Sequence, residues 1–100
     1  MTPTQRSQAY MREHGYLCEV TERWNPFAKI RQDLYGFIDV LCVGEDIVGV
    51  QTTTKENMKA RIDKISNHDN FPAVIASGMR IVVHGWHKKD NRWNLEIFEF

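Results

Sequence analysis

The sequence predicts an α/β fold in which a mixed central sheet is flanked by helices. Two segments, 37–43 and 47–53, are apolar on both faces, as expected of central strands that are covered on each side. An amphipathic segment follows them, and two further β-branched and aromatic segments, 79–86 and 92–100, end the chain. The predicted order, which is helix, three strands, a helix with a short second helix, and two strands, is typical of a mixed sheet with helices packed on it.

The chain is long enough for one domain over residues 1–100 and too short for two. Of its 100 residues, 42% are hydrophobic and 26% are charged, which are the proportions of an ordinary globular protein. Thirteen basic and thirteen acidic residues cancel. The net charge therefore gives no argument for a polyanionic partner, and a nucleic-acid surface would have to come from local clustering.

The cellular compartment is predicted from the cysteines and from the absence of targeting signals. Cys18 and Cys42 lie in apolar segments without a CxxC spacing, so we interpret them as small buried thiols in a reducing compartment. No segment resembles a signal peptide, and none approaches the roughly 20 apolar residues of a membrane-spanning helix. We expect a cytoplasmic protein with no membrane partner, located in the host cytoplasm if it is phage-encoded.

The N-terminal third predicts a helix and one strand. Pro3, good helix formers over 4–13 and Gly15 just beyond them are typical of a short helix. Residues 16–23 alternate loosely and predict a first strand. We expect residues 24–35 to be irregular, because they contain turn formers and no periodic pattern.

The two central segments predict a hairpin with a defined register. If the link is a three-residue turn over 44–46, Val43 pairs with Ile47 and Asp39 lies directly opposite Gln51. Two polar side chains then meet on one face of the sheet.

The rest of the chain predicts two helices and two strands. Thr53 and Glu56 have the spacing of a capping box, and apolar residues recur at helical intervals over 55–66, which predicts a helix there. Residues 71–77 predict a short helix that Gly78 ends. The last two β-branched segments predict strands joined by a charged turn, with the C-terminal strand at an edge of the sheet.

Asp39 is the most informative residue, because an acid within an apolar strand requires compensation. Burying a carboxylate costs several kcal/mol unless the group is paired, hydrogen-bonded or bound to a metal. Asp39 and Gln51 offer the oxygen ligands that a hard cation such as Mg²⁺ or Mn²⁺ prefers. We expect Glu22 or Glu19 on the preceding strand to complete this metal site, and Asp33 is a further candidate.

A purely structural role for Asp39 is the alternative. In that case Arg31, Lys29 or backbone N–H groups would hold the buried carboxylate. His84 and His87 do not suggest a zinc site, because positions i and i+3 of a strand point to opposite faces and no third ligand accompanies them.

Three groups of basic residues could bind the phosphates of a nucleic acid. They are Arg31 with Lys29, then Lys55, Lys59, Arg61 and Lys64 on the predicted helix, and finally Lys88 and Lys89 in the charged turn. A solvated helix face and a charge-protected edge strand explain the second and third groups equally well.

The central segments also resemble a known family. The patterns G-F-I-D-V-L at 36–41 and V-G-V-Q-T-T-T at 48–54, followed by a helix, resemble the PD-(D/E)XK nuclease superfamily. This superfamily has the restriction-endonuclease-like fold of Holliday-junction resolvases and of many repair and phage nucleases. The resemblance covers residues 19–86 and implies an αβββαβ core.

The resemblance implies roles for individual residues. It places the signature Asp at Asp39, the second acidic position at Gln51 and the catalytic Lys at Thr53. In that family the acids hold Mg²⁺, and the Lys orients and polarises the attacking water. Gln and Thr depart from the signature here, so a cation from elsewhere, Lys29, Arg31 or Lys55, would replace the Lys.

We therefore expect a metal-dependent endonuclease that hydrolyses phosphodiester bonds in branched or otherwise structured DNA. By analogy with the family, we expect a homodimer. The alternative is a catalytically inactive, nuclease-like module that binds DNA or inhibits another protein.

Overall fold

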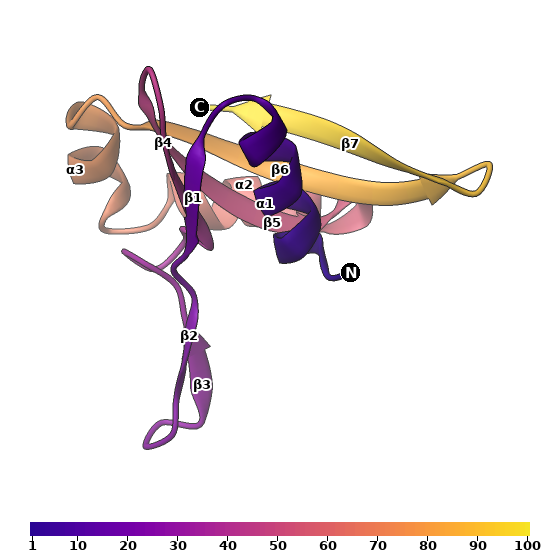
Figure 1. Ribbon diagram of the computed structural model, residues 1–100. Helices are drawn as coiled ribbons and strands as arrows, with labels where there is room; N and C mark the ends of the chain where they lie inside the picture. Colours follow the sequence, from indigo (N-terminus) through magenta and orange to yellow (C-terminus); the bar gives the residue numbers. More distant parts are fainter.

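The computed structural model describes residues 1–100 and contains a five-stranded mixed sheet with helices on both faces (Figure 1). The order of the strands in the sheet is β1-β4-β5-β6-β7; β5 and β6 are parallel, and the other neighbours are antiparallel. These strands are β1 (Leu17–Val20), β4 (Val40–Val43), β5 (Ile47–Thr54), β6 (Arg80–Lys89) and β7 (Arg92–Glu99). The predicted α/β class with a mixed sheet is confirmed, and β7 is an edge strand as predicted.

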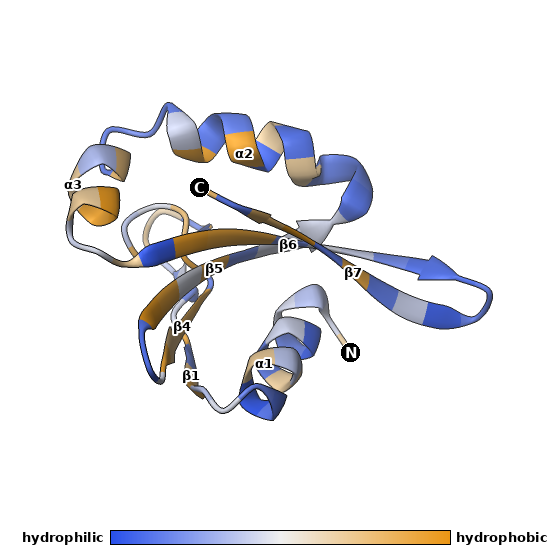
Figure 2. Cartoon of the chain, turned by 90° about the horizontal axis from the view of Figure 1, so that it is seen from above, coloured by the Kyte–Doolittle hydropathy of each residue, from blue (hydrophilic) through white to orange (hydrophobic).

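The helices cover the sheet from opposite sides. They are α1 (Pro3–Glu13), the 3₁₀ turn η1 (Lys55–Asn57), α2 (Met58–Ser66) and α3 (Phe71–Ala76). Figure 2 shows α1 on one face of the sheet and α2 with α3 on the other. No helix combines the length and the apolar character needed to cross a membrane.

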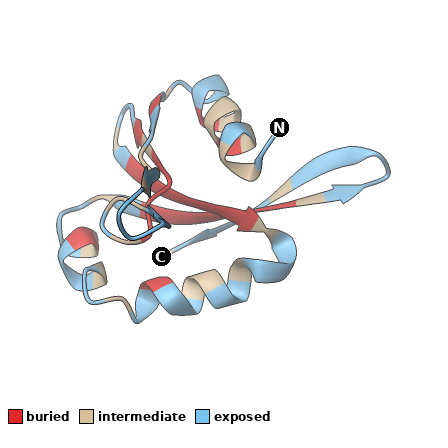
Figure 3. Ribbon diagram, turned by 90° about the horizontal axis from the view of Figure 1, so that it is seen from below, coloured by how far each residue is buried: buried red, intermediate tan, exposed pale blue.

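Two apolar clusters form the core, one on each face of the sheet. The cluster beneath α1 includes Met11, Val50 and Val82, whereas the cluster beneath α2 and α3 includes Ile65 and Val83. Neighbouring residues of β6 thus point into different clusters, which is the alternation of a strand. Figure 3 shows that the buried residues concentrate in the middle strands; two of these, β4 and β5, lie in the segments predicted to be central.

Both ends of the chain follow the local signals in the sequence. Thr2 and Gln5 form a capping box at the start of α1, which offsets the unpaired N–H groups of the first turn. At the other end, β6 and β7 are joined by Asp90 and Asn91, whose φ values of 53° and 60° are left-handed. Two consecutive left-handed residues are the geometry of a tight two-residue hairpin turn.

Three predicted details are wrong. Residues 24–35 are not irregular throughout, because β2 (Arg23–Asn25) and β3 (Ile30–Gln32) form a second, two-stranded sheet. The strand predicted from Phe37 begins only at Val40, since the chain is still turning before it. Helix 55–66 begins as η1 from Thr54 without a side-chain cap, so the predicted capping box does not form.

A buried polar group joins α1 to the sheet. Ser7 is fully buried, and its Oγ lies 2.9 Å from both His84 Nδ1 and Trp86 Nε1. Burial lowers the pKa of His84 to about 4, so the imidazole is neutral at pH 7. Ser7 Oγ can then donate to Nδ1 while it accepts from the indole N–H, which satisfies all three groups.

We expect Ser7→Ala to lower the free energy of unfolding by about 1–3 kcal/mol, because it leaves two buried polar nitrogens without a partner. Urea denaturation measures this change. Ser66→Ala is the matched control, since Ser66 Oγ is exposed and donates only to Asp63 O. An equal and small effect of both substitutions would contradict the assigned role of Ser7.

Candidate metal centre

Three carboxylates gather where β4 begins and the β2–β3 hairpin leaves the main sheet. They belong to Glu22, Asp33 and Asp39, and one oxygen from each lies within 4.8 Å of the other two. Asp39 is buried and the other two are half-buried. The centre therefore combines a buried acid with two acids that solvent can reach.

The β2–β3 hairpin places Glu22 and Asp33 side by side. Arg23 pairs with Gln32 in its register, and one further step along the ladder brings Glu22 opposite Asp33. The hairpin thus closes a gap of eleven positions in the sequence and supplies two of the three acids from its base.

A tight reversal returns the chain from Asp33 to Asp39. Leu34 and Ile38 form an isolated antiparallel bridge, and Gly36 N donates to Asp33 O at 3.0 Å. Gly36 has φ +91° and lies against the His68 ring, where an added Cβ would collide. Glycine is required here for both reasons, and the reversal brings the two aspartates together.

The predicted contact between Asp39 and Gln51 is confirmed. Val43 pairs with Ile47 and Val40 with Val50, which is the register expected for the three-residue turn. Gln51 Nε2 donates to Asp39 Oδ2 at 2.5 Å, and Thr52 N donates to the same oxygen at 2.8 Å.

The structural alternative for Asp39 is realised only in part. Thr52 supplies the backbone N–H that this alternative requires. However, Arg31 pairs with Glu22 at 3.4 Å, and Lys29 is at the tip of the hairpin. Neither cation neutralises the buried carboxylate.

Gln51 leaves one oxygen without a partner. The residue is 2% exposed, and its Oε1 accepts no hydrogen bond although it is buried. An unpaired buried acceptor costs free energy unless a donor or a cation completes it. Gln51 lines the same pocket as the three carboxylates, whose oxygens are ligands that Mg²⁺, Mn²⁺ and Ca²⁺ prefer.

The electrostatics of the centre favour an added cation. Burial, contact with the Asp33 carboxyl and the nearby charge of Glu22 together raise the pKa of Asp39 to about 7, against the opposing effect of the Thr52 N–H. Ionising all three neighbouring carboxyl groups at once is unfavourable, because their negative charges repel one another. A divalent cation would remove this conflict, as it does in metal centres built from carboxylates.

Two hollows meet at the carboxylates. We call the first the acidic pocket; it has a volume of about 300 Å³ and is lined by Pro3, Thr4, Glu22, Arg31, Asp33, Asp39, Gln51, Thr52, Arg61 and Lys64. We call the second the hairpin groove; it has a volume of about 760 Å³ and is lined by residues 20–23 and 31–36 with Lys64, His68 and Asn70. Glu22, Arg31, Asp33 and Lys64 belong to both, so the centre opens on either side.

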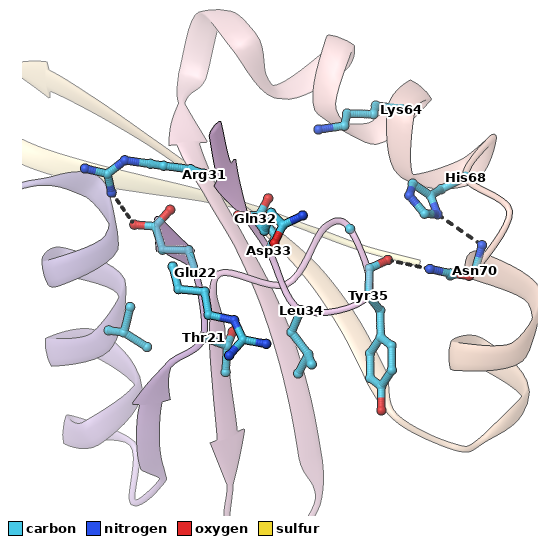
Figure 4. A pocket seen from close by; sticks show the side chains of 13 residues that line it. Thr21, Glu22, Arg31, Gln32, Asp33, Leu34, Tyr35, Lys64, His68 and Asn70 are labelled. Atoms are coloured by element: carbon cyan, nitrogen blue, oxygen red, sulfur yellow. Dashed lines mark hydrogen bonds and ion pairs between the residues drawn. The ribbon is translucent and has the colours of Figure 1, made fainter. Parts of the chain in front are cut away.

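Basic side chains face the acids across these hollows. Figure 4 shows Arg31 bonded to Glu22, and Lys64 and His68 on the opposite side of Asp33. Arg61, one helical turn before Lys64, lines the acidic pocket. Four arginine and lysine residues thus line the two hollows around three acids, and Arg61 and Lys64 form no ion pair.

Several predicted site residues lie elsewhere. Glu19 pairs with Leu41 and is exposed outside both hollows, so the structure does not bring it to the carboxylates. Lys29 lies in the loop beyond the Asn25–Ile30 pair, at the opposite end of the β2–β3 ladder from Glu22 and Asp33. Thr53 is buried opposite Gly85 and lines neither hollow.

The remaining predicted basic residues are also outside the centre. Lys55 pairs with Glu96 at 3.1 Å. Lys59, Lys88 and Lys89 line neither hollow, and the last two lie at the far end of the β6–β7 hairpin. Of the basic residues predicted to bind nucleic acid, the structure brings Arg31, Arg61 and Lys64 to the carboxylates.

The sequence patterns indicate Asp33 only weakly and do not indicate His68 or Asn70 at all. Asp33 was only a further candidate, because its place depends on the reversal over residues 34–38. The signal that could have found it is Gly36, because glycine favours the left-handed backbone of a tight reversal; Gly36 and its neighbour Tyr35 both have positive φ values.

Comparisons with protein-family models, with curated proteins and with solved structures find no match to this chain. The geometry of the centre is therefore the basis for assigning a function.

We expect Asp39→Asn to stabilise the metal-free protein at pH 8. The folded pKa of Asp39 lies above its ordinary value of 3.8, so its contribution to stability falls as the pH rises from about 4 to 7. An isosteric amide removes the buried charge, and we expect the free energy of unfolding to rise by about 1 kcal/mol or more at pH 8, with a smaller gain at pH 5. Urea denaturation at both pH values measures this; a loss of stability at pH 8 would contradict the account.

We expect Mn²⁺ affinity to rise with pH and to level off above about pH 7, where Asp39 is ionised. Below that pH the cation must displace a proton, so binding should release about one proton per ion. Calorimetry in two buffers of different ionisation enthalpy measures both quantities. Affinity that is independent of pH between 5.5 and 8 would show that Asp39 is not a ligand.

Proposed function

We propose that this protein is a metal-dependent endonuclease that hydrolyses phosphodiester bonds in DNA. The observation that carries the proposal is the convergence of Glu22, Asp33 and Asp39 on one point, in a pocket that Gln51, with its unpartnered oxygen, also lines. Such a donor set suits a hard divalent cation, and phosphate oxygens are the natural further ligands of that cation.

The order of the elements supports a restriction-endonuclease-like core. Without the β2–β3 hairpin, α3 and β7, the chain reads α1, β1, β4, β5, α2, β6, which is the αβββαβ order that the family resemblance implies. The parallel pairing of β6 with β5 after α2 agrees with that arrangement. In such a core Asp39 would take the signature position, and Gln51 pairs opposite it in the ladder.

The carboxylates would hold the cation, and the chain's other residues would orient the substrate. When bound, a divalent cation polarises a phosphodiester and lowers the pKa of a coordinated water. Glu22 and Asp33 are half-buried and can receive the cation from solvent, whereas Asp39 is fixed by its bonds to Gln51 and Thr52. Glu22 and Asp33 thus take the place of the acid missing at Gln51.

Lys64 and Arg61 are the residues that we propose in place of the signature Lys. Both line the acidic pocket, and Lys64 extends toward Asp33 in Figure 4. Cations positioned beside a phosphate stabilise the charge that develops during its hydrolysis. Thr53 cannot supply that charge. Lys29 is at the tip of the hairpin, away from the carboxylates, and Lys55 is paired with Glu96.

The test is cleavage of labelled flayed, nicked and four-way DNA in Mg²⁺ or Mn²⁺. We expect Asp39→Asn to reduce the rate by about 100-fold or more, because it removes a ligand, and Lys64→Met to reduce it by about tenfold or more. Lys88→Met, on the distant β6–β7 hairpin, is the matched control. Sedimentation of the same samples tests the proposed homodimer.

A catalytically inactive DNA-binding or protein-inhibiting module is the second candidate. Its support is the replacement of two signature positions, by Gln51 and by the buried Thr53. DNA binding without cleavage in either metal would favour this candidate and would contradict the enzymatic proposal.

A further inference from the structure

The β2–β3 hairpin projects from the body of the protein (Figure 1). None of the residues of its two strands is buried, and its strands pair with each other rather than with the main sheet. Because the hairpin projects into solvent and its strands add nothing to the core, folding stability does not explain its presence, which indicates a binding role.

The hairpin combines cations with exposed apolar side chains. Residues 23–32 include Arg23, Lys29 and Arg31 and no acidic residue. Phe27 at the tip is 97% exposed and Trp24 is 58% exposed. Large exposed aromatic groups among cations are the composition of surfaces that bind single-stranded nucleic acid, where bases stack on the rings and cations neutralise phosphates.

One face of the hairpin is continuous with the metal centre. Trp24 lies directly opposite Arg31 in the ladder. The next pair on that face, two residues along each strand, is Glu22 with Asp33. A strand of nucleic acid lying along Trp24 and Arg31 would therefore lead to two of the three carboxylates.

The tip of the hairpin is ordered by its own hydrogen bonds. Asn25 Oδ1 accepts from Phe27 N at 3.0 Å and from Ala28 N at 3.1 Å, while Asn25 Nδ2 donates to Gln32 Oε1 at 3.3 Å. This Asx-type turn holds Phe27 outward without any support from the core. A ligand would thus meet a preformed aromatic tip, which lowers the entropic cost of binding.

We propose that the β2–β3 hairpin is an arm that binds a single-stranded segment of DNA next to the metal centre. Bases stack on Trp24 and Phe27, and Arg31, on the same face as Trp24, together with Lys29 at the tip neutralises the adjacent phosphates. The inference rests on the proposed function and narrows the substrate to DNA in which one strand leaves the duplex beside the cleaved bond, as at a flap or a fork.

Charge argues against a second copy of this chain as the occupant of the arm. Two identical hairpins would bring six cations and no acid together, and like charges at such an interface are repulsive. A lipid surface is also disfavoured, because Trp24 and Ile30 point to opposite faces of the hairpin and offer no single apolar side.

The test is the binding of fluorescently labelled single-stranded, blunt duplex and forked DNA in EDTA, where cleavage cannot occur. We expect Trp24→Ala and Phe27→Ala each to weaken binding of single-stranded and forked DNA about fivefold or more, with little effect on blunt duplex. We expect Lys29→Gln to reduce the dependence of log affinity on log salt by about 0.7. Leu17→Ala, an exposed apolar residue on β1, and Lys88→Gln are the matched controls.

Unchanged affinity of the hairpin variants, or equal losses for blunt duplex, would overturn the inference. A change in sedimentation or in binding to anionic vesicles, with DNA binding unaffected, would overturn it in favour of a second copy or a membrane. If the wild-type protein cleaves DNA and Trp24→Ala binds single-stranded DNA unchanged, the proposed role of the arm is wrong and the proposed nuclease activity stands. If the hairpin variants bind single-stranded DNA more weakly but the wild-type protein does not cleave DNA, the proposed role of the arm stands and the proposed nuclease activity is wrong.

Discussion

The hydrogen bonds that Asp39 Oδ2 accepts from Gln51 and Thr52 are the constraint on which the centre depends. They lie at the point where β4 begins. The carboxylate accepts from the backbone N–H of Thr52 and so ties the start of β4 to β5. Because the residue is 3% exposed, loss of these bonds would leave a buried acid uncompensated. The same bonds leave the rest of the carboxyl group directed at Asp33 and Glu22. One interaction thus supports both the sheet and the candidate metal site.

The centre is costly for folding, and this cost is typical of functional sites. Burial, together with the neighbouring acids Asp33 and Glu22, raises the pKa of Asp39 to about 7, and Gln51 Oε1 is buried without a partner. A chain selected only for stability would pair these groups or replace them with apolar residues. Arg31, the only cation in an ion pair with the three acids, contacts Glu22 at the solvent side, where screening makes such a pair weak.

The elements with local signals were predictable, and those that depend on distant contacts were not. The helix from Pro3 and the Val43–Ile47 turn follow from capping, periodicity and turn length, and the turn fixed the register of Asp39 against Gln51. The β2–β3 hairpin was missed because its three-residue strands bury nothing and show no alternation. The assembly of Glu22 with Asp33 depends on that hairpin, so the full set of acids became visible only in three dimensions.

The site that results holds more acids than the sequence indicated. The base of the hairpin adds Glu22 and Asp33 to Asp39, and α2 contributes Lys64 to the lining of the same pocket. A crystal structure of the protein soaked in Mn²⁺, with anomalous scattering recorded at the manganese edge, tests this account most directly. If the three carboxylates hold the cation, an anomalous peak lies at coordination distance, about 2.2 Å, from oxygens of Asp33, Asp39 and Glu22. A saturated crystal with no peak there, or with its peak elsewhere, would contradict it.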